Sequence, residues 1–120
     1  MNKIEFGQWV RSEREKRKWS QADLARESGL YRSLINNIEG GVSESAPKTL
    51  KALGNAFNYD ADYMFELVGL LPSKTELSPI KRMLLKLAKE LPDSDIEMVI
   101  SLLEQRTAYY KKNPRAKPSK

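Results

Sequence analysis

Hydrogen-bonding side chains gather in one short stretch, SQADLARESGLYRSLINNIEGG, which spans residues 20–41. Within it, Ile35 and Ile38 lie three residues apart, the spacing of an inward-facing helical stripe. A helix over residues 32–39 would therefore turn its amides and its arginine outward. Asparagine can pair with adenine, and arginine with guanine, through two hydrogen bonds in the major groove of DNA, and a helix fits that groove. We expect this outer face to contact DNA through Arg32, Ser33, Asn36 and Asn37.

A second short helix is expected just before this one. Ser20 suits the cap of its first turn, and Asp23 three residues later gives an acidic variant of the capping box. Gly29 permits the left-handed turn that ends the helix. Gln21 and the free N–H groups of the first turn would then meet a phosphate of the DNA backbone.

Composition narrows the class of protein. The 120 residues include no cysteine and no histidine, which removes disulfides, thiol nucleophiles, the usual zinc ligands and the commonest general base. We therefore expect no enzyme, no cofactor and no metal. No apolar run approaches the roughly 20 residues that span a bilayer, and the opening MNKIEFGQW lacks the apolar stretch of a signal peptide. We expect a cytoplasmic, nucleoid-associated bacterial protein with no membrane contact.

The net charge of +5 is unevenly distributed. Residues 1–68 hold ten Lys/Arg and ten Asp/Glu, whereas residues 69–120 hold eleven and six. The last ten residues, KKNPRAKPSK, contain five basic side chains and no acidic one. Such a tail either keeps a protein soluble or follows a DNA groove, and the sequence favours neither. Because residues 1–68 are balanced, charge alone does not identify them as a nucleic-acid binder.

Helical periodicity dominates the chain, and no strand alternation is convincing. We predict an all-α fold with a connection rich in glycine and proline between its two parts. Ser94 and Glu97 have the spacing of a capping box for the last helix. The predicted helices cover residues 3–17, 21–28, 32–39, 46–57, 61–68, 79–91 and 95–111. The predicted organisation is a DNA-binding domain over 1–68, a linker over 69–78, a helical segment over 79–112 and a basic disordered tail over 113–120.

The stretch WSQADLARESGLYRSLINNIEGG resembles the helix-turn-helix of lambdoid phage repressors and Cro proteins, the Cro-repressor-type family. The likeness extends over about residues 5–68, which makes it more specific than a glycine between two short helices. It implies a five-helix lambda-repressor-like domain with its recognition helix at residues 32–39. The matching positions are Phe6, Gly7, Val10, Arg14, Ser20, Gln21, Leu24, Ala25, Gly29, Ile35, Ile38, Glu39, Gly40, Thr49, Leu50, Leu53 and Phe57.

The resemblance also implies a role for each site residue. Asn36 would contact the DNA backbone or a neighbouring base, and Gln21 would hold a phosphate. Arg14 and Glu39 would form a partly buried ion pair that aligns the helices more than it stabilises them. Base edges would be contacted by Tyr31, Arg32, Ser33 and Asn37, and the same strand would be held further along by the amides of Gly40 and Gly41 and by Lys48.

Three positions depart from the family pattern. Tyr31 stands where a small Ser or Thr usually caps the recognition helix, so the cap is lost or shifted and a phenol points towards DNA. Gly54 replaces an alanine, which should weaken its helix slightly. Glu44 lies in the loop near the expected DNA side, where it would repel phosphates. Together with the balanced charge, these departures predict modest DNA binding by a monomer.

The last helix has apolar residues on two faces, and such a helix needs two partners. One face carries Met98, Leu102 and Tyr109, which we expect to form a homodimer interface. The alternative is that this helix packs back on the first five within one chain. A two-fold dimer would read two half-sites and so increase the affinity of a weak monomer.

These patterns favour a bacterial or phage transcriptional regulator, a repressor that binds an inverted-repeat operator in double-stranded DNA as a homodimer. The C-terminal part is too short for a self-cleaving domain, so derepression would need an antirepressor, a host protease or a competing regulator. One alternative is the antitoxin of a toxin–antitoxin pair, whose last two helices grip a toxin protein. Another is an adaptor of the same fold that binds protein and not DNA; the balanced charge of residues 1–68 is its support.

Overall fold

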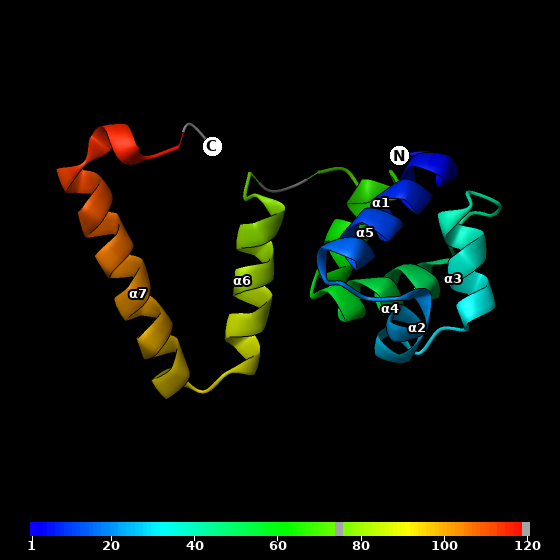
Figure 1. Cartoon of the computed structure of the whole chain (residues 1–120), viewed down its shortest axis with the longest axis horizontal. Helices are drawn as coiled ribbons and strands as arrows, with labels where there is room; N and C mark the ends of the chain where they lie inside the picture. Colours follow the sequence, from blue (N-terminus) through cyan, green and yellow to red (C-terminus); the bar gives the residue numbers. More distant parts are fainter. Residues whose placement is uncertain (74–75, 119–120) are drawn as a thin grey trace. The chain divides into compact units, whose positions relative to one another are not determined.

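The computed structural model describes residues 1–73 and 76–118. In these residues the chain is all-α, as predicted, with no strand (Figure 1). None of the helices described is long and apolar enough to cross a membrane. The elements are α1 (Lys3–Lys16), α2 (Gln21–Ser28), α3 (Arg32–Glu39), α4 (Pro47–Phe57), α5 (Ala61–Leu67), α6 (Pro79–Glu90), α7 (Asp93–Lys112) and a 3-10 helix (Pro114–Ala116).

One hydrophobic core joins the first five helices. Leu50, Leu53 and Phe57 form the inner stripe of α4 and are fully buried. The stripes of the other four helices close around them, so the short helices, which would be marginal alone, are held by packing. The further core residues are Phe6, Val10, Leu24, Ile35, Ile38, Ala56, Tyr59 and Met64.

Side-chain caps set where several of these helices begin. Ser20 and Asp23 form the expected capping box at α2, and a backbone hydrogen bond from Ser20 holds the pKa of Asp23 below its ordinary value. Asn2 and Glu5 form a second capping box, at α1, which the sequence analysis did not identify. The expectation at α7 was wrong: Pro92 is its N-cap residue and makes no side-chain hydrogen bond, so Ser94 lies inside the helix.

Two glycines permit close contacts between helices. A β-carbon added at Gly7 of α1 would lie 2.2 Å from the carbonyl oxygen of Ile38 in α3. One added at Gly54 of α4 would lie 2.9 Å from the carbonyl oxygen of Tyr59 and 2.9 Å from Cγ of Met64. Gly54 was expected only to weaken α4, but the lack of a side chain is what lets α4 and α5 approach.

A buried carboxylate, Glu13, ties α1 to the chain that follows α4. Only 2% of its surface is exposed, and it accepts hydrogen bonds from Tyr59 and from Lys16. Burial disfavours its charged form, but these hydrogen bonds hold the pKa of Glu13 below its ordinary value. Arg17 completes the cluster by donating to the carbonyl oxygen of Phe57 at 2.8 Å, with its guanidinium 4.7 Å from the centre of that ring.

The chain divides into two compact units, Met1–Lys86 and Leu87–Lys120. Residues 79–112 were all expected in the C-terminal part, whereas the first unit includes α6 as far as Lys86. Within the stretch 113–120, expected to be disordered, Pro114–Ala116 form a 3-10 turn with Ala116 N–H donating to the carbonyl oxygen of Asn113.

Gly7→Ala should destabilise the first unit by about 3 kcal/mol, because the new methyl group meets rigid backbone and the helices must move apart. Urea unfolding followed by tryptophan fluorescence would measure the change. Gln8→Ala, at the next and exposed position of α1, is the control and should change the free energy of unfolding by less than about 0.5 kcal/mol. Equal effects of the two variants would show that the α1–α3 contact tolerates a side chain.

Candidate nucleic-acid interface

The outer face of α3 presents the row of side chains that the sequence predicted to contact DNA. Ile35 and Ile38 are buried and turn the opposite face outward. Tyr31 is 83% exposed and precedes the helix without a side-chain cap, as expected from its departure from the family pattern. The other exposed residues of this face are Arg32, Ser33, Asn36 and Asn37. Its polar groups are therefore presented to a partner from a rigid helix.

Arg14 and Glu39 form a bidentate ion pair between α1 and the end of α3. Arg14 Nε lies 2.8 Å from Glu39 Oε2, and Nη2 lies 3.0 Å from Oε1. Their side chains are only 13% and 5% exposed. The hydrogen bonds to Glu39 raise the pKa of Arg14, and its remaining nitrogen, Nη1, donates to the carbonyl oxygen of Trp19 at 2.8 Å. One guanidinium thus fixes α3 and the chain entering α2 against α1.

The same carboxylate also positions Gln21, the residue expected to hold a phosphate. Gln21 is the first residue of α2, and its Nε2 donates to Glu39 Oε1 at 3.3 Å and to Asn36 Oδ1 at 3.5 Å. The first amides of a helix have no acceptor within it and carry partial positive charge. Gln21 therefore lies where an anion is favoured, beside a residue of the recognition face.

The amides of Gly40 and Gly41 do not have the role expected of them. Gly40 N–H donates to the carbonyl oxygen of Asn36, and Gly41 N–H donates to that of Ile38, both at 3.0 Å. These hydrogen bonds close the C-terminal turn of α3, so the two amides are not free to bind a phosphate. The sequence analysis took the glycines for an anion site, whereas the structure uses their amides to end a helix.

The start of α4 offers backbone amides without an acceptor inside the helix, unlike Gly40 and Gly41, whose amides are already hydrogen-bonded. Its N-cap residue, Ala46, makes no side-chain hydrogen bond, and Pro47 occupies the first turn. Lys48 follows and is exposed. An uncapped helix N-terminus with an adjacent lysine favours an anion, and the phosphate contact expected of Lys48 stays a prediction.

Arg11 was not predicted as a site residue, although it lies beside residues that were. It lines a shallow hollow of about 330 Å³ together with Gln21, Asn36 and Asn37. It pairs with Glu15 at 2.8 Å, but both side chains are more than half exposed. Its spacing of three residues before Arg14 on α1 was the available signal, since it places both arginines near one face.

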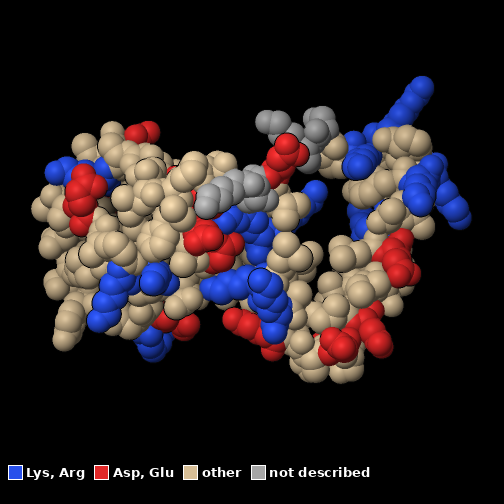
Figure 2. Space-filling view, turned by 180° about the vertical axis from the view of Figure 1, so that it is seen from behind, with Lys and Arg blue, Asp and Glu red and all other residues tan. Residues whose placement is uncertain are grey.

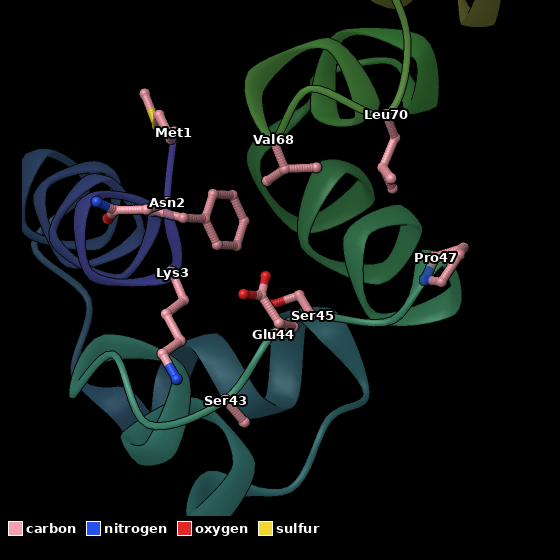
Figure 3. A pocket seen from close by; sticks show the side chains of 10 residues that line it. Met1, Asn2, Lys3, Ser43, Glu44, Ser45, Pro47, Val68 and Leu70 are labelled. Atoms are coloured by element: carbon pink, nitrogen blue, oxygen red, sulfur yellow. The ribbon is translucent and has the colours of Figure 1, made fainter.

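A second hollow lies beside the loop that leads into α4 (Figure 3). Phe6, Val68 and Leu70 give it apolar walls, and its volume is about 240 Å³. Ser45 Oγ, which lies there, is the one buried side-chain polar atom without a hydrogen-bond partner in the part of the chain described. Ligand pockets are usually larger, about 300–1,000 Å³, so we interpret this hollow as a packing feature of the loop. Glu44, whose repulsion of phosphates was expected, is another of its lining residues.

The residues expected at a dimer interface lie on the surface of α7. Met98 is 73% exposed, Leu102 59% and Tyr109 45%. Ile100 and Leu103, on the second apolar face of this helix, are also each nearly half exposed. No residue of α7 is buried.

Comparison with known proteins identifies the class. Residues 7–70 match a family of helix-turn-helix domains, over more than half of the chain, and the chain belongs to that family. The competence pilus inhibition repressor of Acinetobacter baylyi (strain ATCC 33305 / BD413 / ADP1) is 26% identical over 109 residues, which are 86% of this chain and 99% of the relative. A solved chain of the SinR protein/SinI protein complex is 16% identical with a TM-score of 0.46, over 86% of this chain and 98% of that one. The family match supports the helix-turn-helix and does not single out the Cro-repressor type.

Glu39→Gln should cost about 3 kcal/mol of folding free energy, because it leaves the Arg14 guanidinium without its counter-charge in a largely buried site. Glu15→Gln is the matched control: it removes a carboxylate from an equally short pair, Arg11–Glu15, that is exposed, and should change stability by less than about 1 kcal/mol. Chemical denaturation of both variants measures the difference. A loss no larger than that of the control would refute the role given to the pair.

Proposed function

We propose that this protein is a sequence-specific DNA-binding regulator of transcription, a repressor of the Cro-repressor type that reads an inverted-repeat operator with α3. One observation carries the proposal. The largely buried Arg14–Glu39 pair holds both the recognition helix and Gln21, while every polar residue of the outer face of α3 stays exposed. Family membership and the relative named as a repressor support the same assignment.

The contacts divide into two kinds. Arg32 and Asn37 would read base edges, since their fork-shaped groups match guanine and adenine. Tyr31, at the entrance to the helix, would pack on a thymine methyl group or bond a phosphate, and Ser33 and Asn36 would supply further hydrogen bonds. Gln21 and Lys48, each in the first turn of its helix, would hold phosphates on either side and set the register of α3 on the duplex. Occupying a promoter in this way would block transcription.

We place the dimer interface on α7. In water, the exposed apolar residues Met98, Leu102 and Tyr109 favour burial against a partner. A second copy of the chain presents the same apolar face and could bury them. Charge supports that occupant. In α7 the acidic residues Asp93, Asp95 and Glu97 lie at the beginning, while Lys111 and Lys112 lie at the end. Figure 2 shows acidic side chains at the beginning and in the middle of this helix and basic side chains towards its end.

Two copies of α7 related by a two-fold axis across the helix run antiparallel. The acidic beginning of one would then lie beside the basic end of the other, whereas parallel copies would bring like charges together. An antirepressor or a toxin protein with a similar apolar helix would compete for this face, which offers a route to derepression.

Selection of sites from a random duplex library, at about 100 mM salt, tests the DNA-reading role. Wild-type protein should enrich an inverted repeat with half-site centres about one helical turn, or a multiple, apart. Asn37→Ala and Arg32→Ala should each relax the preference at particular base positions, by about 1–3 kcal/mol per base pair. Lys48→Ala should weaken all sites alike and lower the salt dependence by about one phosphate contact.

Arg26→Ala is the matched control, because it removes a guanidinium from the exposed face of α2 and should leave the selected sequence unchanged. If the Arg32 and Asn37 variants select the wild-type sequence with wild-type tolerance, α3 is not the reading element. If wild-type protein enriches no motif, the adaptor that binds protein becomes the better account.

Leu102→Glu should dissociate the dimer, since two buried and unpaired carboxylates would face each other across the two-fold axis. Sedimentation velocity at micromolar concentration would show a shift to monomer with the helical content unchanged. Ser101→Glu adds the same charge at the neighbouring exposed position and should remain dimeric. Dimers of equal strength in both variants would place the interface elsewhere.

A further inference from the structure

The first turns of α6 are held against the five-helix domain through Arg82. Its Nη2 lies 2.8 Å from Asp60 Oδ1 and 2.8 Å from Glu66 Oε2, and its Nε donates to Asp60 Oδ2 at 3.2 Å. Only 11% of the Arg82 side chain is exposed, and 10% of Glu66. A guanidinium between two carboxylates, largely out of water, is a directional contact that few side-chain arrangements satisfy.

Other contacts extend this anchor along one face of α6. The Arg82 guanidinium lies 5.0 Å from the centre of the Tyr63 ring, and Met83 packs against the hydrophobic core. One turn later, Lys86 Nζ donates to the carbonyl oxygen of Tyr59 at 3.1 Å. Positions 82 and 86 share a helix face, so two successive turns of α6 are fixed to the first unit.

Asp60 links this anchor to the domain itself. Its side chain caps α5 by accepting from the Tyr63 N–H at 2.7 Å, while the same carboxylate binds Arg82. Burial disfavours its charged form, but the Tyr63 amide and the Arg82 guanidinium hold the pKa of Asp60 below its ordinary value. The hydrogen bond that Arg82 donates to Glu66 in turn raises the pKa of Arg82. Asp60 and Arg82 therefore keep their charges at neutral pH.

Because Arg82 holds the first turns of α6, the path from the DNA-binding domain to α7 differs from a free connection. A flexible connection of about ten residues would have a root-mean-square reach of about 17 Å and would let two DNA-binding domains fit half-sites at many separations. The helix anchored by Arg82 instead runs unbroken to Glu90, past the boundary of the first unit at Lys86.

We infer that Arg82 is a positioning residue that narrows operator spacing: by binding Asp60 and Glu66 it holds the first turns of α6 on the DNA-binding domain, so a dimer reaches fewer half-site separations than a free connection would allow. This inference rests on the proposed function, since it assumes a dimer that reads two half-sites. Arg82 touches no DNA in this account and acts through the helix that it holds.

Binding to a series of operators tests the inference. Each operator carries the selected half-sites, and the spacer between them is varied in single base pairs over one helical turn. Wild-type protein should bind its best spacer at least about tenfold more tightly than one longer by half a turn, which is about 5 base pairs. Arg82→Gln should reduce that ratio to about threefold or less, with the same half-site sequence and an unchanged dimer. Lys89→Gln removes one charge from an exposed position of the same helix and should keep the wild-type ratio.

Asp60→Asn provides a second variant, because asparagine also caps a helix well and so removes only the charge that Arg82 binds. It should flatten the spacing profile in the same direction. Amide hydrogen exchange should become faster over residues 79–86 in both variants and stay unchanged in α1–α4, which a general loss of stability would not produce.

The possible results distinguish a failure of the spacing inference from a failure of the proposed function. An inverted repeat selected by wild-type protein, with equally steep spacing profiles for wild type and Arg82→Gln, would overturn the inference alone. Selection of no inverted repeat by wild-type protein would overturn the proposed function and this inference with it.

Discussion

The crossing of α1 and α3 is the constraint on which the DNA-facing surface depends. The missing side chain at Gly7 lets the two helices approach until backbone meets backbone, and the Arg14–Glu39 pair fixes their rotation at the other end of the contact. An ion pair of this kind adds little net stability, because its desolvation offsets much of the attraction. Its value lies in direction: Glu39 holds Gln21 as well, so the start of α2 and the face of α3 are positioned by one carboxylate.

Local signals explain how far the sequence could predict this arrangement. Ser20 and Gly29 delimit α2 by capping rules that need no distant partner, and the stripe of Ile35 and Ile38 decides which face of α3 stays exposed. Glu13 and Arg82 were missed because their partners lie 46 and 22 residues away, at Tyr59 and Asp60, and nothing in the pattern of charges says which polar residues a fold will bury. The amides of Gly40 and Gly41 were misassigned for the converse reason: a glycine pair after a helix fits a helix end and an anion site equally well.

The balanced charge of residues 1–68 has a structural explanation. Part of it is used inside the molecule, since Glu13 and Glu39 are paired with Arg17 and Arg14 in sites that water barely reaches. Such paired charges contribute little to a long-range field, and the exposed charges of both signs determine how the domain acts on a phosphate backbone. A domain of this kind has a small electrostatic, sequence-independent share of binding. Under the proposed function, its affinity would come from base contacts and from joining two domains.

Joining two domains increases affinity only where their separation matches the two half-sites, because a tether that can reach many positions spreads the effective concentration over all of them. The element that transmits this geometry is therefore as important as the interface that forms the dimer. In this chain the element is α6, whose first turns belong to the DNA-binding unit and whose last residues belong to the unit that carries α7. Under the proposed function, Arg82 acts on operator spacing because α6 is one continuous helix whose first turns it holds on the DNA-binding unit.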